Sequence, residues 1–176
     1  MPSNVPPSFL DLLGGCTESA VHLEMRDVYA VDYERGPFAN WRTGFRHDPA
    51  DRASWWRPWL DVVTEAVGRG VAIRRARIVS EPVSEYTRYL YDTTFTNMAA
   101  GEQVRWLPRQ RASDIPLPGN DFWLFDGQLV QWNHFAGDGS SQGPEVTDEP
   151  AAVKLCTDAF EAVWERASPH GQYEIH

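Results

Sequence analysis

The sequence predicts an α/β (α+β) protein with one mixed, buried β-sheet, which includes a C-terminal hairpin and is flanked by helices. Strand-like and helix-like apolar patterns alternate along the chain, as they do in sheets covered by helices. Asp126-Gly127 stands between two β-prone runs, an arrangement typical of a hairpin. A length of 176 residues, 42% of them hydrophobic, suits a single core. We therefore expect residues 1–176 to form one domain.

The first part of the chain is expected to hold little regular structure. Three prolines predict an extended tail over residues 1–7, followed by a short helix over residues 8–13 that two glycines stop. Residues 20–29 alternate between apolar and polar side chains, which favours a half-buried strand. A helix is the alternative there, because Leu, Glu, Met and Arg all favour one. Residues 31–47 contain Gly-Pro and further glycine, and we expect them to be irregular.

The middle of the chain is predicted to hold two helices and two strands. An N-cap at Asp48 opens the first helix, which Pro58 splits or kinks. Residues 71–79 carry apolar side chains on both faces, which indicates an interior strand covered on both sides. A second helix occupies about residues 80–101, and a short strand over residues 103–108 follows it.

The hairpin, a loop and a helix complete the prediction. A two-residue turn at Asp126-Gly127 would pair Phe125 with Gln128 and Leu124 with Leu129. That register places four side chains on one face: Trp123, Phe125, Val130 and Trp132. The glycine-rich residues 136–147 are expected to form a flexible loop, and residues 150–167 an amphipathic helix.

Composition narrows the classes of function. The formal net charge of −9 and the lack of a basic recognition helix disfavour direct nucleic-acid binding, and the charge also disfavours anionic membranes. No apolar run approaches the ~20 residues that span a bilayer, and the first residues lack the basic region of a signal peptide. Only two cysteines occur, far apart, so we expect free buried thiols, no metal and no cofactor. These features predict a cytoplasmic protein, and they leave the oligomeric state open.

The basic residues are concentrated in the middle of the chain. Residues 69–111 hold eight arginines and four acids, an excess of +4. Arginine beside tryptophan can hold an anionic or planar ligand by forked hydrogen bonds and stacking. The candidate ligand-binding residues are Arg75, Arg77, Arg105, Trp106, Arg109, Asn133 and His134. The alternative is that Trp106 lies in the core and the arginines pair with the surplus acids.

Most catalytic motifs are absent: the sequence contains no Walker loop, Rossmann fingerprint, His-Glu-x-x-His or Gly-x-Ser-x-Gly. On a strand, His22 and Glu24 would point the same way and could form an acid/base row. With His134, which follows the hairpin, they are the only candidate catalytic residues, and a solvated strand face is the alternative interpretation. No residues are predicted to bind a metal.

Several segments in this order resemble the actinobacterial domain-of-unknown-function family 6879. The segments that carry the resemblance are Ala20–Tyr29, Trp55–Asp61, Ala76–Pro82, Val104–Arg109, Pro118–Asp126 and Asn133–Phe135. The resemblance covers nearly the whole chain, from Phe9 to about Tyr173. Members of this family often accompany helix-turn-helix regulators, so the resemblance implies such a regulator as a partner.

A weaker resemblance of architecture, from Arg105 through the hairpin to His134, is to phospholipase-D-like domains. The catalytic motif of those enzymes, His-x-Lys-x-x-x-x-Asp, is absent here. We therefore expect a non-enzymatic, cytoplasmic regulatory or sensor protein that binds a small anionic ligand or a partner protein. The alternative is a cryptic, phosphodiesterase-like hydrolase that uses His22, Glu24 and His134.

Overall fold

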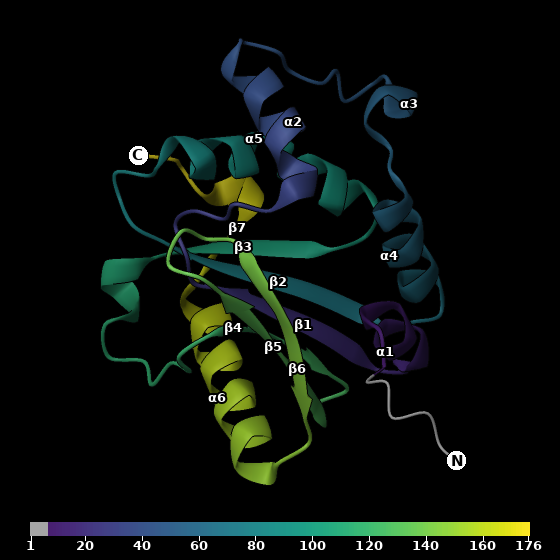
Figure 1. Ribbon diagram of the computed structural model, residues 1–176, viewed down its shortest axis with the longest axis vertical. Helices are drawn as coiled ribbons and strands as arrows, with labels where there is room; N and C mark the ends of the chain where they lie inside the picture. The colour runs from purple at the N-terminus through teal and green to yellow at the C-terminus, as the bar shows by residue number, and fades with distance from the viewer. Residues whose placement is uncertain (1–6) are drawn as a thin grey trace.

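The computed structural model describes residues 7–176 and contains one mixed seven-stranded sheet (Figure 1). The strand order is β6-β5-β4-β1-β2-β3-β7; β1, β2 and β3 are parallel neighbours, and the other pairs are antiparallel. The strands are β1 Ser19–Glu24, β2 Ala72–Val79, β3 Gln103–Pro108, β4 Asp121–Phe125, β5 Leu129–Phe135, β6 Ser141–Thr147 and β7 Ser168–Pro169. The predicted fold class is confirmed. The tail predicted over residues 1–7 lies outside the described residues, apart from Pro7.

Helices cover both faces of the sheet. They are α1 Phe9–Gly15, α2 Asp32–Arg42, α3 Arg52–Trp55, α4 Pro58–Gly68, α5 Glu85–Ala99 and α6 Pro150–Arg166, with short 3-10 turns at Arg109–Ala112 and His170–Gln172. The long helix α6 packs on one face through Cys156, Phe160 and Val163. Helices α1 and α4 lie on the opposite face (Figure 1). There they pack against Trp123 and Phe125 of β4.

Residues 20–29 form a strand as far as Glu24, so the strand interpretation of this segment is confirmed over its first half. The prediction of irregular structure over residues 31–47 is wrong, because α2 occupies Asp32–Arg42. The reason is tertiary packing: Phe38 and Trp41 of α2 pack against Tyr86 and Tyr89 of α5. Burial of these rings outweighs the weak helix propensity of the Gly-Pro pair inside the helix.

The flexible loop predicted over residues 136–147 is also wrong in its second half. Residues Ser141–Thr147 form β6, an edge strand that pairs antiparallel with β5 and includes Gly143 and Pro144. Proline is tolerated at such an edge because the outer side of the strand has no partner to bond. The glycine-rich segment is a turn between two strands, and the sheet extends beyond the hairpin.

The hairpin forms, but its register differs by one residue from the prediction. Asp126 and Gly127 both have positive φ, of 50° and 64°, yet Phe125 pairs with Leu129. The turn is held from outside, since the Asp126 carboxylate accepts hydrogen bonds from the backbone N–H groups of residues 17, 18 and 19 at 2.8–3.0 Å. The shift exchanges the partners across the hairpin: Phe122 and Leu124 share a face with Val130 and Trp132, while Trp123 and Phe125 share the other with Leu129.

Candidate functional site

A cavity of about 560 Å³ lies between α2, α5 and the sheet face opposite α6; we call it the central cavity. Strands β1, β2, β4 and β5 supply its floor, and α2 and α5 supply most of its walls. Its lining combines charged groups with eight aromatic side chains, which are Phe9, Tyr29, Tyr33, Trp59, Tyr86, Tyr89, Trp123 and Phe135. A concave, largely aromatic site with a few convergent polar groups is typical of small-ligand binding.

The floor of the central cavity is an ion-pair network on two parallel strands. The register of β1 and β2 places His22 beside Arg75 and Glu24 beside Arg77, and alternation points all four side chains into the cavity. One carboxylate oxygen of Glu24 accepts from Arg75 Nη1 at 2.5 Å, and the other accepts from Arg77 Nε at 2.6 Å. These side chains are only 7–13% exposed. The strand alternation proposed for His22 and Glu24 is therefore present, but as a buried network.

A second carboxylate completes this network. The fully buried Glu102 accepts from Arg75 Nε and also from Asn97 Nδ2 at 2.8 Å. Arg77 also donates to Thr94 Oγ1 at 2.6 Å. Two guanidinium groups thus meet two carboxylates, and their charges cancel. An anionic ligand would find no free charge at Arg75 or Arg77.

The two arginines lower the pKa of Glu24. Burial by itself would raise that pKa, but the charges of Arg77 and Arg75 hold it well below its ordinary value. Glu24 is therefore ionised across the physiological pH range.

His22 is held firmly between this network and the aromatic part of the floor. Its ring stacks on the indole of Trp123, with centroids 4.3 Å apart and an interplanar angle of 8°. Its Nδ1 donates to the carbonyl oxygen of Phe122 at 2.8 Å, and its Nε2 lies 3.3 Å from a carboxylate oxygen of Glu24. Both ring nitrogens therefore face oxygen atoms of the protein.

Two further carboxyl groups line the central cavity, Asp121 on the floor and Glu34 on the wall, and each accepts a hydrogen bond from a tyrosine hydroxyl. Tyr29 donates to Asp121, which also accepts from the backbone N–H of residue 25 at 2.9 Å, and Tyr86 donates to Glu34. Burial raises the pKa of Asp121 to about 6, although the Tyr29 hydrogen bond opposes the rise. Burial likewise raises the pKa of Glu34 against the hydrogen bond from Tyr86. Burial thus moves the pKa of both carboxyls upward, opposite in direction to the pKa of Glu24.

The structure separates the other residues proposed for binding or catalysis. Asn133 lines the central cavity opposite Asp121 in the sheet. Trp106 is completely buried and donates to His170 Nδ1 at 3.0 Å, so its proposed ligand-binding role is wrong and the core interpretation holds. His134 is not part of the cavity lining; it lies 3.1 Å from Glu145 of β6. The proposed catalytic trio therefore does not converge, because only His22 and Glu24 reach the cavity.

Two of the proposed arginines also lie elsewhere. Arg105 is on the α6 side of the sheet, where it donates to the carbonyl oxygen of Trp164 at 2.9 Å and stacks on that indole. Arg109 donates to Ser80 Oγ at 2.9 Å, to the carbonyl oxygen of Met25 just after β1 at 2.5 Å and to that of Ile78 in β2 at 3.4 Å, so it links the ends of these two strands. Strand alternation explains the first case, since Arg105 pairs with Ala76 and so points away from Arg75 and Arg77.

Sequence analysis missed three charged residues of the cavity: Glu34, Arg57 and Asp121. Glu34 was missed because α2 was not predicted. Asp121 could have been found from the sequence, because it begins the first strand of the hairpin and pairs with Asn133, which was already a candidate ligand-binding residue. Arg57, at the N-cap of α4, carries no local signal at all.

Residues 7–176, which the structure describes, contain neither a metal-binding group of side chains nor a membrane-spanning helix. No group of three or more His, Cys, Asp or Glu side chains is arranged to hold a metal ion. Among the helices of this part of the chain, none has the length and apolar character required to cross a bilayer.

The fold belongs to the class seen in phospholipase D family members. The structure of one of them, Nuc from Salmonella typhimurium, aligns with a TM-score of 0.51 at 9% identity, over 91% of this chain and 86% of that one. NucT from Helicobacter pylori aligns with a TM-score of 0.49 at 11% identity, over 91% and 87% of the two chains. The archaeal chromatin protein TrmBL2 aligns with a TM-score of 0.48 at 13% identity, over 90% of this chain and 48% of that one. At 9% identity the likeness to Nuc shows the fold alone.

The chain itself belongs to the family described as domain of unknown function DUF6879, whose model matches residues 7–175. This match confirms the resemblance found from the sequence segments. No curated protein sequence matches the chain.

Proposed function

We propose that this protein is a regulatory or sensor domain that binds a small organic molecule in the central cavity. The observation that carries the proposal is the floor of that cavity, in which His22, Glu24, Arg75 and Arg77 are all hydrogen-bonded or ion-paired beneath aromatic walls. A rigid polar floor needs no reorganisation when a ligand arrives, which favours tight and selective binding.

The charges of the cavity indicate what its ligand offers. Because Arg75 and Arg77 are neutralised within the protein, the groups left for a ligand are the carboxyls of Asp121 and Glu34, tyrosine hydroxyls, the side chain of Asn133 and, at the edge shared with a neighbouring cavity, the guanidinium of Arg57. Most of these accept hydrogen bonds. The central cavity therefore suits a planar molecule with hydrogen-bond donors better than the anion first expected at these two arginines.

A hydrolase remains the alternative function, favoured by the contact of His22 with Glu24 inside a cavity. Against it, both nitrogens of His22 face oxygen atoms of the protein, so neither is free to take a proton from a substrate. Hydrolysis of bis(p-nitrophenyl) phosphate tests this directly. A rate above background that the His22→Gln substitution abolishes would replace the sensor proposal.

The experiment that tests the sensor proposal is a fragment screen by ¹H–¹⁵N correlation spectroscopy, followed by calorimetry of the hits. Hits should shift the amide signals of residues around the central cavity. Tyr29→Phe and Tyr86→Phe should lower the affinity of these hits, because each removes a tyrosine hydroxyl from the cavity. Arg88→Gln is the matched control, because Arg88 is exposed on α5 and does not line the central cavity. The proposal would be refuted if every hit binds elsewhere, or if neither tyrosine substitution changes the affinity of the hits.

We further propose a cytoplasmic location and a helix-turn-helix regulator as the partner that responds to the ligand. The family resemblance supports this partner. Co-purification of the tagged protein from its native cells, with and without a ligand from the screen, tests the idea. A regulator whose recovery is independent of the ligand would separate partnership from sensing.

A further inference from the structure

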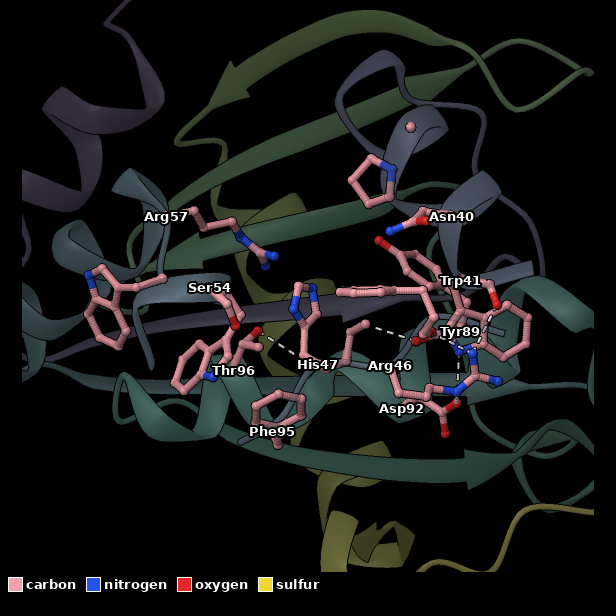
Figure 2. Close-up of a pocket in the computed structure, with 16 residues that line it drawn as sticks. Asn40, Trp41, Arg46, His47, Ser54, Arg57, Tyr89, Asp92, Phe95 and Thr96 are labelled. Atoms are coloured by element: carbon pink, nitrogen blue, oxygen red, sulfur yellow. Dashed lines mark hydrogen bonds and ion pairs between the residues drawn. The ribbon is translucent and has the colours of Figure 1, made fainter. Parts of the chain in front are cut away.

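A second cavity, of about 530 Å³, lies between α2, α3, α5 and the segment that joins α2 to α3 (Figure 2). It is distinct from the central cavity, although Pro37, Arg57, Tyr89 and Thr93 line both. Nothing in the function proposed above uses this space.

One end of the second cavity is electrically neutral and rigid. Asp92 of α5 accepts from Trp41 Nε1 at 2.8 Å and lies 3.0 Å from Arg46 Nε. The Arg46 guanidinium lies 4.3 Å from the centroid of the Trp41 ring and donates to the Trp41 carbonyl at 2.9 Å. Arg46 and Asp92 therefore satisfy each other, and Arg46 fastens the segment after α2 to α5.

Three polar side chains of this cavity remain without a partner. Within residues 7–176, the guanidinium of Arg57 and the amide of Asn40 form no hydrogen bond or ion pair, and Nδ1 of His47 is a buried atom with no partner. Figure 2 shows Arg57, His47 and Asn40 projecting into the same space from three different segments. With Arg46 and Asp92 cancelling, Arg57 leaves this space with a net positive charge.

The remaining lining is aromatic. Trp55 is 7% exposed and meets Phe95 of α5 edge to face, with centroids 5.2 Å apart at 77°. Trp56, Phe45 and Tyr89 extend this surface. Such walls accept the faces and edges of a planar ring.

We propose that the second cavity binds a planar aromatic molecule that carries one anionic group, either a carboxylate or a phosphate monoester. Arg57 and His47 hold the anion, because an uncommitted guanidinium presents a planar fork that matches the oxygens of both groups. The ring lies against Trp55 and Phe95. Among the arginines that line the two cavities, Arg57 is the one without a partner in residues 7–176, whereas Arg75 and Arg77 are paired with carboxylates and Arg46 is paired with Asp92. Because Arg57 lines both cavities, the test has to show that the anion is held in the second one.

The test uses benzoate, phenyl phosphate, inorganic phosphate and the neutral benzyl alcohol, each titrated against the full chain and followed by calorimetry and by the ¹⁵N shifts of residues 40–57. One or both aromatic anions should bind to the wild type and to the control Arg88→Gln with equal affinity. Arg57→Gln should weaken binding at least ~10-fold, as expected for a lost charge-assisted hydrogen bond, and His47→Gln should weaken it less. Arg57 is exposed, so its substitution leaves the core intact.

Two filling variants assign the binding to one cavity. Asn40→Trp narrows only the second cavity and should abolish binding, whereas Asn133→Trp narrows only the central cavity and should leave it unchanged. A difference between benzoate and phenyl phosphate identifies the anion. The proposal is overturned if benzyl alcohol binds as well as benzoate, if inorganic phosphate binds as well as either ring compound, or if Arg57→Gln has no effect. The absence of binding by every probe at roughly 10 mM, a weak-fragment affinity, would overturn it equally.

Discussion

Replacing Glu24 by Gln tests whether the floor of the central cavity is held by charge. Glu24 is 13% exposed and is the only carboxylate paired with Arg77 in the described structure. The substitution leaves the Arg77 guanidinium, 7% exposed, without an opposite charge and with only neutral hydrogen-bond partners, while Arg75 keeps Glu102. Removing one partner of a buried ion pair costs about 3–5 kcal/mol because the other charge stays buried. That is a large share of the ~5–15 kcal/mol by which domains are stable.

Equilibrium unfolding in urea, followed by tryptophan fluorescence, measures this cost. With an m-value of about 2 kcal/mol/M, the midpoint should fall by roughly 2 M without a change in m. Glu161→Gln is the matched control: its carboxylate pairs with Arg74 at 2.7 Å but is 53% exposed, so its loss should cost less than ~1 kcal/mol. Adding Arg77→Met to Glu24→Gln should restore part of the stability. If Glu24→Gln costs no more than the control, the network does not stabilise the fold and the reasoning is wrong.

The pKa values and contacts of two other carboxylates yield further predictions. Burial raises the pKa of Asp121 to about 6 in the folded protein, above its value in the unfolded chain. The folded state therefore holds this proton more tightly, and the protein should become more stable as the pH falls from about 7 to 4. The same stabilisation is lost as the pH rises through the folded-state pKa. The contribution of Asp121 is about 3 kcal/mol for about 2 pKa units, and urea midpoints of Asp121→Asn should lack this rise. Asp126→Ala removes three hydrogen bonds to backbone N–H groups and should cost about 2–3 kcal/mol at neutral pH. These bonds hold the pKa of Asp126 below its ordinary value despite partial burial, so the penalty should shrink as the pH falls through that pKa. An Asp126→Ala midpoint equal to the wild-type midpoint would show that the turn does not need this anchor.

Long apolar patterns were predicted well because local sequence and burial agree there. The 3–4 spacing of α6 and the two-sided apolar strand β2 each have one solution that buries their side chains, and both form as expected. Elements whose stability comes from distant partners were missed. Helix α2 depends on rings of α5, and β6 depends on the exposed edge of β5.

The candidate site was half predicted for a similar reason. Period-two alternation brings His22, Glu24, Arg75 and Arg77 to one sheet face once two strands are parallel neighbours, and each pair was visible within its own strand. The pairing of the two strands was not visible. Because of this pairing, Arg75 and Arg77, which the sequence suggested as anion-binding residues, form ion pairs with Glu24 and Glu102.

The sequence by itself determined that this chain is an acidic α/β protein, with a hairpin, a buried interior strand and the segments of its family. These features rest on local patterns of burial and turn formation, which act over a few residues. Only the tertiary structure decided which charges remain free. It neutralises Arg75 and Arg77 in the floor of the central cavity, and within residues 7–176 it leaves Arg57 without a partner between two cavities. The physical reason is that the interaction of two charges depends on their separation and desolvation, and the folded chain sets both.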